Sequence, residues 1–311
     1  MCGTQKYRLV TRSDFDGLVC AVLLESIDLI DDILFVHPND MQHGRVKITD
    51  TDITTNLPYV SGVHIAFDHH ASEDVRVGKV IKNHINDSLA PSAARVVYEY
   101  YGGKEKFKAI DDDLMTAVDK ADSAQFTIDE VMNPSGWALL NFITDPRTGL
   151  GRFREFRIPN YEFMMALIDF VHEHSIQEIL QLPDVKERVE FYLNHQDKFI
   201  DQTKRCSVVE ENLVTIDLRN EEIIFSGNRF LVYALFPDCN ISMHIMRGRR
   251  NKGVIFALGK SIFNQNSKTN VGNLLLKYGG GGHIAAGTCQ IDDSSAEAVQ
   301  IEIARRVLAD G

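Results

Sequence analysis

Two short clusters of acidic and imidazole side chains are the residues of this chain best suited to do chemistry. Asp14 and Asp16 stand one residue apart and are followed by Gly17, which allows a sharp backbone turn. Carboxylates at this spacing present oxygen ligands for hard divalent cations. The pattern alone also fits a helix cap or a calcium loop.

The second cluster is the triplet Asp68-His69-His70. Imidazole beside carboxylate is the usual ligand mixture for manganese, iron or zinc. The alternative interpretation is a hydrogen-bonded histidine pair at the end of a strand. Asp50 and Asp122 would complete a metal cluster, although each alone is more typical of a cap or a surface position.

A glycine run near the C-terminus is a candidate anion site. Gly280, Gly281 and Gly282 present backbone N–H groups with no side chain in the way, and His283 adds a donor. We therefore predict that these four residues bind substrate. A flexible linker is the alternative, but the flanking apolar residues are typical of packed structure.

The charge of the chain is acidic overall and basic in one segment. The formal net charge of −11 over 311 residues argues against a protein that coats long nucleic acid. Residues 241–289 nevertheless contain basic side chains and no Asp or Glu, a balance that attracts a small anionic substrate. We predict that Arg247 and Lys260 bind substrate; Arg249 and Arg250 belong to the same segment. A solvated loop face is the alternative.

The elements that must position these residues alternate between strand and helix in the N-terminal part. This alternation predicts an α/β fold with a parallel sheet and helices on both faces. The predicted strands are residues 7–11, 33–36, 46–49 and 63–67, and the predicted helices are residues 17–30 and 91–101. Because ligands bind outside the carboxyl ends of parallel strands, Asp14, Asp50 and Asp68 are expected to meet at one edge of the sheet.

The remaining sequence predicts a helical linker and a second, smaller α/β domain. The predicted helices are residues 161–172 and 185–200, a long loop or insertion is expected at 144–160, and the later strands are 213–217, 241–246 and 254–258. We place the domains at residues 1–203 and 213–311. Five scattered cysteines, no signal pattern and no long apolar stretch predict a cytoplasmic protein without membrane contact.

These motifs together resemble the DHH phosphoesterase family, named for its Asp-His-His triplet. The triplet is accompanied by TRSDFDGLVCA at Thr11–Ala21, KITD at Lys47–Asp50, VDKADS at Val118–Ser123 and YGGGGHIAAG at Tyr278–Gly287. The family joins a parallel-sheet catalytic domain to a DHH-associated domain with a Gly-Gly-Gly-His signature. The exopolyphosphatase-like and nanoRNase/pAp-phosphatase-like members are the most similar.

The resemblance implies a metal-dependent phosphoesterase. The matching metal-ligand positions are Asp14, Asp16, Asp50, Asp68, His69 and Asp122, with Asp119 as the alternative to the last. Two Mn²⁺ ions, or Mg²⁺ or Co²⁺, would activate water for in-line attack. His70 matches the catalytic position beside the phosphate. The expected substrate is a short single-stranded oligonucleotide, a nucleotide phosphate or polyphosphate.

The chain departs from the family at Arg12, where a histidine usually supplies a metal ligand. Val10, at the other possible spacing, cannot bind a metal either. His37, His43 or Asp52 would have to replace the missing ligand, or Arg12 takes a catalytic role by binding phosphate. The alternatives are a RecJ-like single-strand exonuclease and a nonhydrolytic nucleotide- or polyphosphate-binding protein. A homodimer is left open.

Overall fold

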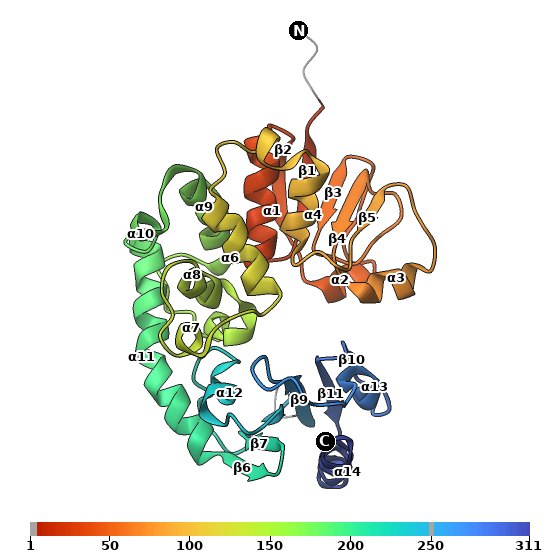
Figure 1. Cartoon of the computed structure of the whole chain (residues 1–311), viewed down its shortest axis with the longest axis vertical. Coiled ribbons are helices and arrows are strands. Elements are labelled where there is room, and N and C mark those ends of the chain that lie inside the picture. Colours follow the sequence, from red (N-terminus) through yellow and green to blue (C-terminus); the bar gives the residue numbers. More distant parts are fainter. Residues whose placement is uncertain (1–4, 249–251) are drawn as a thin grey trace. The chain divides into compact units, whose positions relative to one another are not determined.

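The chain folds into two compact units, shown in the computed structural model of Figure 1, which describes residues 5–248 and 252–311. The first unit contains the described residues up to Phe126 together with Pro134–Phe191. The second contains Thr127–Asn133 and the described residues from Tyr192 onward. Arg249 and Arg250 of the predicted basic segment lie outside the described residues.

A parallel five-stranded sheet forms the centre of the first unit, in the order β2-β1-β3-β4-β5. Its strands are β1 (Tyr7–Thr11), β2 (Ile30–Phe35), β3 (Asp52–Thr55), β4 (Ile65–Asp68) and β5 (His84–Asn86). The predicted α/β class and the strand at residues 7–11 are confirmed. The strand predicted at residues 46–49 is wrong, because β3 begins only at Asp52.

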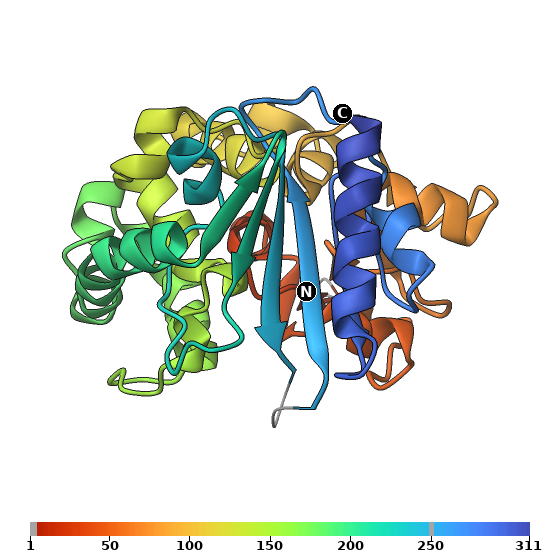
Figure 2. The same cartoon turned by 90° about the horizontal axis from the view of Figure 1, so that it is seen from below.

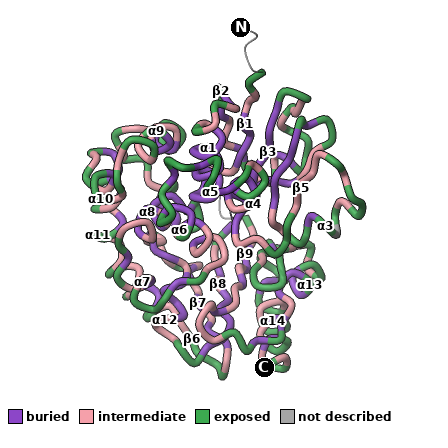
Figure 3. The backbone as a smooth tube through the Cα atoms, turned by 45° about the horizontal axis from the view of Figure 1, so that its top comes forward, coloured by how far each residue is buried: buried purple, intermediate pink, exposed green. Residues whose placement is uncertain are grey.

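The two faces of this sheet are covered in different ways. Helix α1 (Phe15–Ser26) packs against β1 and β2 and is buried along most of its length, as Figure 3 shows. On the opposite face, Val10 of β1 packs with Met41 and with the loop residues Val46 and Ile48. Val46 and Ile48 explain why a strand was wrongly predicted at residues 46–49, because their apolar side chains pack against the sheet from a loop. The predicted helical layer is therefore reduced on this face.

The first unit contains eight further described α-helices besides α1. They are α2 (Pro38–Gln42), α3 (Ala71–Val77), α4 (Ala93–Tyr100), α5 (Gly103–Lys106), α6 (Asp112–Asp122), α8 (Gly136–Thr144), α9 (Asn160–Glu173) and α10 (Ile176–Ile179). The predicted loop at residues 144–160 contains two short 3₁₀ turns, Pro146–Thr148 and Leu150–Arg152. Helices α1, α4 and α6 contact one another, so residues distant in sequence meet at their ends.

A mixed six-stranded sheet forms the centre of the second unit, in the order β10-β11-β9-β8-β7-β6. Its strands are β6 (Ser207–Glu210), β7 (Leu213–Asp217), β8 (Ile241–Arg247), β9 (Val254–Lys260), β10 (Gly281–Gly282) and β11 (Ala286–Ile291). The helices are α7 (Ile128–Met132), α12 (Leu231–Leu235), α13 (Val271–Leu276) and α14 (Ala296–Asp310). Helix α14 lies along the sheet in Figure 2, and its Ile303 and Val307 enter the core.

Helix α11 (Pro183–Arg205) contains residues of both units. It carries charged side chains along its length, as expected for the predicted helical linker. None of the helices in the described ranges has the length and apolarity needed to cross a bilayer.

Gly17 tests the packing at the start of α1. Its φ is not in the left-handed region, so the predicted sharp turn is not the reason for glycine. A Cβ at this position would lie 2.0 Å from the Arg12 carbonyl oxygen and 2.8 Å from Thr11 Oγ1. We predict that Gly17→Ala destabilises the fold by about 1–3 kcal/mol through overpacking. The measurement is the thermal unfolding midpoint, compared with Gly151→Ala, whose added Cβ meets nothing within 4 Å. Equal midpoints for the two variants would contradict this account.

Candidate metal centre

Two buried carboxylates follow β1 and are each fixed by a helix N-terminus. Asp14 is the N-cap of α1 and accepts a hydrogen bond from Gly17 N at 3.1 Å. Asp16 accepts hydrogen bonds from Ala93 N at 3.0 Å and Ala94 N at 2.8 Å, at the start of α4. Unpaired N–H groups and the helix dipole both favour a negative charge there. Backbone N–H groups at the starts of α1 and α4 therefore hold both carboxylates in place.

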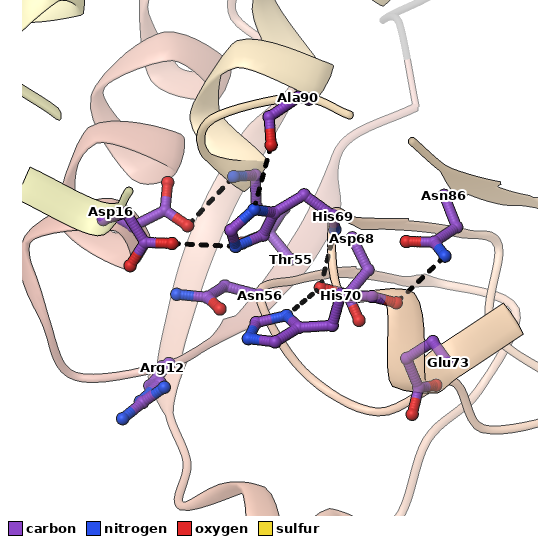
Figure 4. A network of polar contacts seen from close by, with 12 residues as sticks. Arg12, Asp16, Thr55, Asn56, Asp68, His69, His70, Glu73, Asn86 and Ala90 are labelled. Carbon is purple, nitrogen blue, oxygen red and sulfur yellow. Dashed lines mark hydrogen bonds and ion pairs between the residues drawn. The ribbon is translucent and has the colours of Figure 1, made fainter. Parts of the chain in front are cut away.

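Asp16, His69 and Asp122 converge on one point. One ligand atom from each of these residues lies within 4.8 Å of the others. Asp122 ends α6, and its Oδ2 lies 2.8 Å from His69 Nε2. His69 Nδ1 lies 3.3 Å from the Ala90 carbonyl oxygen on the other side of the ring (Figure 4). The structure thus brings together three of the predicted ligands from α1, the end of β4 and α6.

The electrostatics of this cluster reflect excess negative charge. Burial, and after it the negative charge of the neighbouring Asp122, raises the pKa of Asp16 to about 7. Burial opposes the charged form of His69, but its contact with Asp122 and the charges of Asp16 and Asp68 outweigh burial and raise its pKa to about 9. The cluster therefore strongly favours a positive charge.

Asp68 connects the triplet to the same edge of the sheet. It is buried at the end of β4, and its Oδ1 lies 2.8 Å from the His69 backbone N and 2.7 Å from His70 Nδ1. Asp68, His69 and His70 form a second group of potential ligands. Burial opposes protonation of His70, but Asp68 outweighs it, so the His70 pKa is raised.

Asp119 and Asp122 take different roles on α6. Asp119 Oδ2 accepts hydrogen bonds from Nε and Nη2 of Arg95, and its Oδ1 accepts a 2.7 Å hydrogen bond from Ser92 Oγ, which fixes α6 to α4. Asp122 instead contacts His69. Of the two alternatives in the sequence, the structure therefore brings Asp122 to the cluster.

Asp50 is not brought to the cluster, and its predicted placement is wrong. It is exposed and precedes β3, whose first residue, Asp52, pairs in register with Arg8 at the start of β1. It therefore lies at the amino ends of the strands. Asn56 follows the carboxyl end of β3 instead, and its Nδ2 donates to Asp14 at 3.2 Å. Sequence reasoning missed Asn56 because the strand was assigned to earlier residues.

Arg12 pairs with Asp14 through Nε at 2.9 Å. The proposed replacements for the missing histidine have other partners: His37 caps α2 and His43 contacts Asn39. Asp52 is held by Arg8. Another cation that the sequence did not single out is Arg147, from the 144–160 loop, whose charge acts to lower the pKa of both Asp14 and Asp122.

The glycine run does not form the predicted open row of N–H groups. Gly280 N donates to Leu275 O and His283 N donates to Ala286 O, while Gly281 and Gly282 pair with β11. Gly280 and Gly282 are needed for close packing, because a Cβ at either position would lie 2.2 Å from a backbone oxygen of β11. A Cβ at Gly281 meets nothing within 4 Å. The prediction of an open row of four N–H groups was wrong, because those of Gly280 and His283 donate to backbone carbonyls.

Arg247 and Lys260 do not lie together. The antiparallel register pairs Arg247 with Val254 and Ile241 with Lys260, which puts the two basic residues at opposite ends of the hairpin. Lys260 N donates to Ala285 O beside the glycine run. Arg247 forms an ion pair at 2.6 Å with Asp293. Asp293 lies just after the segment 241–289, which has no Asp or Glu. Arg247 is therefore distant from Lys260 and the glycine run, and its role in binding substrate stays a prediction.

The residues of the cluster fit a divalent cation. His69 Nε2 is buried and has no hydrogen-bond partner among the described residues, since its short contact with Asp122 lacks hydrogen-bond geometry. The carbonyl of Ala90 near Nδ1 is the arrangement that orients a metal-binding imidazole. Asp16, His69 and Asp122, with Asp68 adjacent, would hold the cation through the oxygen and nitrogen donors that Mn²⁺ accepts.

This assignment predicts different outcomes for neighbouring aspartates. We expect Asp122→Asn to weaken Mn²⁺ binding by about 100-fold or more, since loss of even an outer-shell group costs 10–100-fold. Asp119→Asn should leave Mn²⁺ affinity unchanged and lower the unfolding midpoint, because it breaks the Arg95 pair. Calorimetric titration with Mn²⁺ and thermal unfolding measure both quantities. Equal loss of affinity in the two variants would contradict the assignment.

Comparison with known proteins finds a close relative among solved structures. No protein-family model and no curated protein matches the sequence. A pGpG-specific phosphodiesterase from Vibrio cholerae is 58% identical, with 98% of this chain and 100% of that chain covered and a TM-score of 0.86.

More distant structures share the fold. The DHH domain of a protein described as belonging to a family of ribosomal proteins is 14% identical, with a TM-score of 0.58 over 98% of this chain and 87% of that chain. RecJ from Thermus thermophilus in complex with Mn²⁺ is 12% identical, with a TM-score of 0.58 over 98% and 52%. The resemblance indicated by the sequence motifs is confirmed. The chain belongs to the DHH family of metal-dependent phosphoesterases.

Proposed function

We propose that this chain is a phosphodiesterase that hydrolyses pGpG, the 5′-phosphorylated guanine dinucleotide. The observation that carries this proposal is the 58% identity to a pGpG-specific phosphodiesterase across the full length of that protein. A short dinucleotide also agrees with the net charge of −11, which disfavours long nucleic acid. Hydrolysis of the single internal phosphodiester of pGpG gives two guanosine monophosphates.

The side chains at the carboxyl ends of β1 and β4 would position the reaction. Asp16, His69 and Asp122 would hold a divalent cation, for which we propose Mn²⁺. When bound, such a cation supplies a Lewis acid and lowers the pKa of water. Asp16 is fixed by two backbone donors and His69 by its neighbours on both ring nitrogens, so the donors are preorganised for the cation.

His70 is the proposed proton donor to the leaving oxygen. Its side chain is 29% exposed, whereas Asp68 beside it is buried. The imidazole is therefore open to solvent while its partner is held in place. The contact between Asp68 Oδ1 and Nδ1 orients the ring. The raised pKa of His70 favours the protonated form that a general acid requires.

A phosphate or sugar group of the substrate is proposed to bind within the second unit, beside β10 and the end of β9. Lys260 lies at this end, held by an Nζ hydrogen bond to Ser267 O at 3.0 Å. His283 is exposed beside it, and Gly281 leaves open space for close approach to the backbone. These features support a phosphate- or sugar-binding role.

The RecJ-like exonuclease is the less favoured alternative. This chain covers only 52% of RecJ but 100% of the pGpG-specific phosphodiesterase. A substrate panel with Mn²⁺ separates the two: pGpG, longer single-stranded oligonucleotides, pAp, cyclic dinucleotides and polyphosphate. We expect kcat/KM to be highest for pGpG. A higher value for long single strands or polyphosphate would overturn the proposal.

Asp68→Ala tests the catalytic arrangement. We predict that this substitution lowers kcat on pGpG by about a thousandfold or more, equivalent to about 4 kcal/mol of transition-state stabilisation. The reason is that Asp68 orients His70 and belongs to the second ligand group. The matched control is Asp74→Ala, an exposed carboxylate in the first turn of α3. Retention of more than about a tenth of the wild-type kcat, with the fold intact by circular dichroism, would contradict the role.

A further inference from the structure

Asp14 already has partners on both of its oxygens. Oδ1 accepts from Gly17 N at 3.1 Å and from Asn56 Nδ2 at 3.2 Å. Oδ2 pairs with Arg12 Nε at 2.9 Å. Asp14 belongs to neither group of potential metal ligands among the described residues. Its carboxylate is therefore engaged by protein donors.

The charges around Asp14 also disfavour a cation. The buried carboxylate of Asp14 carries one negative charge, which the guanidinium of Arg12 balances, and Asn56 is neutral. The positive charge of Arg147 also acts on Asp14. Bringing a divalent cation into a partly buried site without net negative charge is costly, because its desolvation is not compensated.

The neighbouring group of Asp16, His69 and Asp122 has an excess of negative charge, unlike the surroundings of Asp14. Asp16 and Asp122 contribute two carboxylates, Asp68 lies beside them, and His69 offers a buried nitrogen without a hydrogen bond in the described structure. A divalent cation there gains both charge neutralisation and a nitrogen donor that suits Mn²⁺. The two halves of the centre, adjacent at the carboxyl ends of β1, β3 and β4, therefore differ in what they can bind.

We propose that this centre tightly binds a single divalent cation, at Asp16, His69 and Asp122, and that the guanidinium of Arg12 takes the place of a second cation. This inference rests on the proposed phosphodiesterase function and specifies its site. Arg12 Nε forms an ion pair with Asp14, and its Nη atoms have no hydrogen bond to a described residue. Those two atoms match the geometry of a bidentate bond to phosphate oxygens.

Metal stoichiometry tests the proposal without using activity. Full-length protein is stripped with a chelator and titrated with Mn²⁺ by calorimetry, and the bound ions are examined by electron paramagnetic resonance. We expect one tight Mn²⁺ per chain with the spectrum of an isolated ion. The double variant Arg12→His/Asn56→Asp supplies an imidazole and a carboxylate around Asp14, so it should bind a second Mn²⁺ and show the spectrum of a coupled pair.

The matched control is Arg8→His/Asn160→Asp. Arg8 pairs with Asp52 through Nε at 2.8 Å at the other end of β1, so the change is chemically equivalent but distant from the centre. Asn160 is exposed at the start of α9, where an aspartate is tolerated. The control should bind the same single Mn²⁺ as the wild type.

The Arg12→His variant adds a kinetic readout. We expect it to need less Mn²⁺ for half-maximal rate and to raise KM for pGpG about tenfold, since one bidentate phosphate contact is lost. A wild-type chain with two tight Mn²⁺ ions, or a folded double variant that still binds one, overturns the inference. A single Mn²⁺ without pGpG hydrolysis would instead remove the proposed function and leave the stoichiometry standing.

Discussion

The burial of several carboxylates at one edge of the sheet is the constraint on which this site depends. Asp14, Asp16 and Asp68 are almost completely buried at one edge of the parallel sheet. Burial raises the pKa of both Asp14 and Asp16, so their charged forms need compensation. The fold supplies part of it through the helix N-termini of α1 and α4, whose backbone donors point at these oxygens. The remainder requires positive charge.

The chain meets this requirement in two different ways within a few residues. Around Asp14 the positive charge is built in, as the side chain of Arg12. Around Asp16 the positive group that acts to lower its pKa is the imidazole of His69, whose own pKa is raised by the surrounding carboxylates. A cation at His69 would replace its proton, whereas a cation at Asp14 would have to displace a guanidinium. This difference links the sequence departure at Arg12 to the chemistry of the site.

Much of the site was predictable because it depends on short local motifs. The pattern at Asp14 and Asp16 and the triplet at residues 68–70 follow strands that the apolar runs indicate, so their convergence follows from parallel topology. Asn56 was not predictable in this way. The apolar residues Val46 and Ile48 imitate a strand but pack from a loop, which moved the assigned strand end to Asp50.

The second unit was less predictable because its roles depend on long-range pairing. The sequence shows a glycine run and a basic segment, but strand register decides which N–H groups are used and which basic residues are neighbours. Backbone hydrogen bonds to Leu275 O and Ala286 O engage the N–H groups of Gly280 and His283, and the β8–β9 register separates Arg247 from Lys260. Neither fact is local in the sequence.

The central claim concerns where positive charge resides, and anomalous diffraction tests it most directly. A crystal of the full chain soaked with Mn²⁺, measured on both sides of the manganese absorption edge, locates each bound ion. The account predicts one strong anomalous peak between Asp16, His69 and Asp122, with Arg12 still paired to Asp14. A second peak of comparable height between Asp14 and Asn56, or no peak at His69, would contradict it.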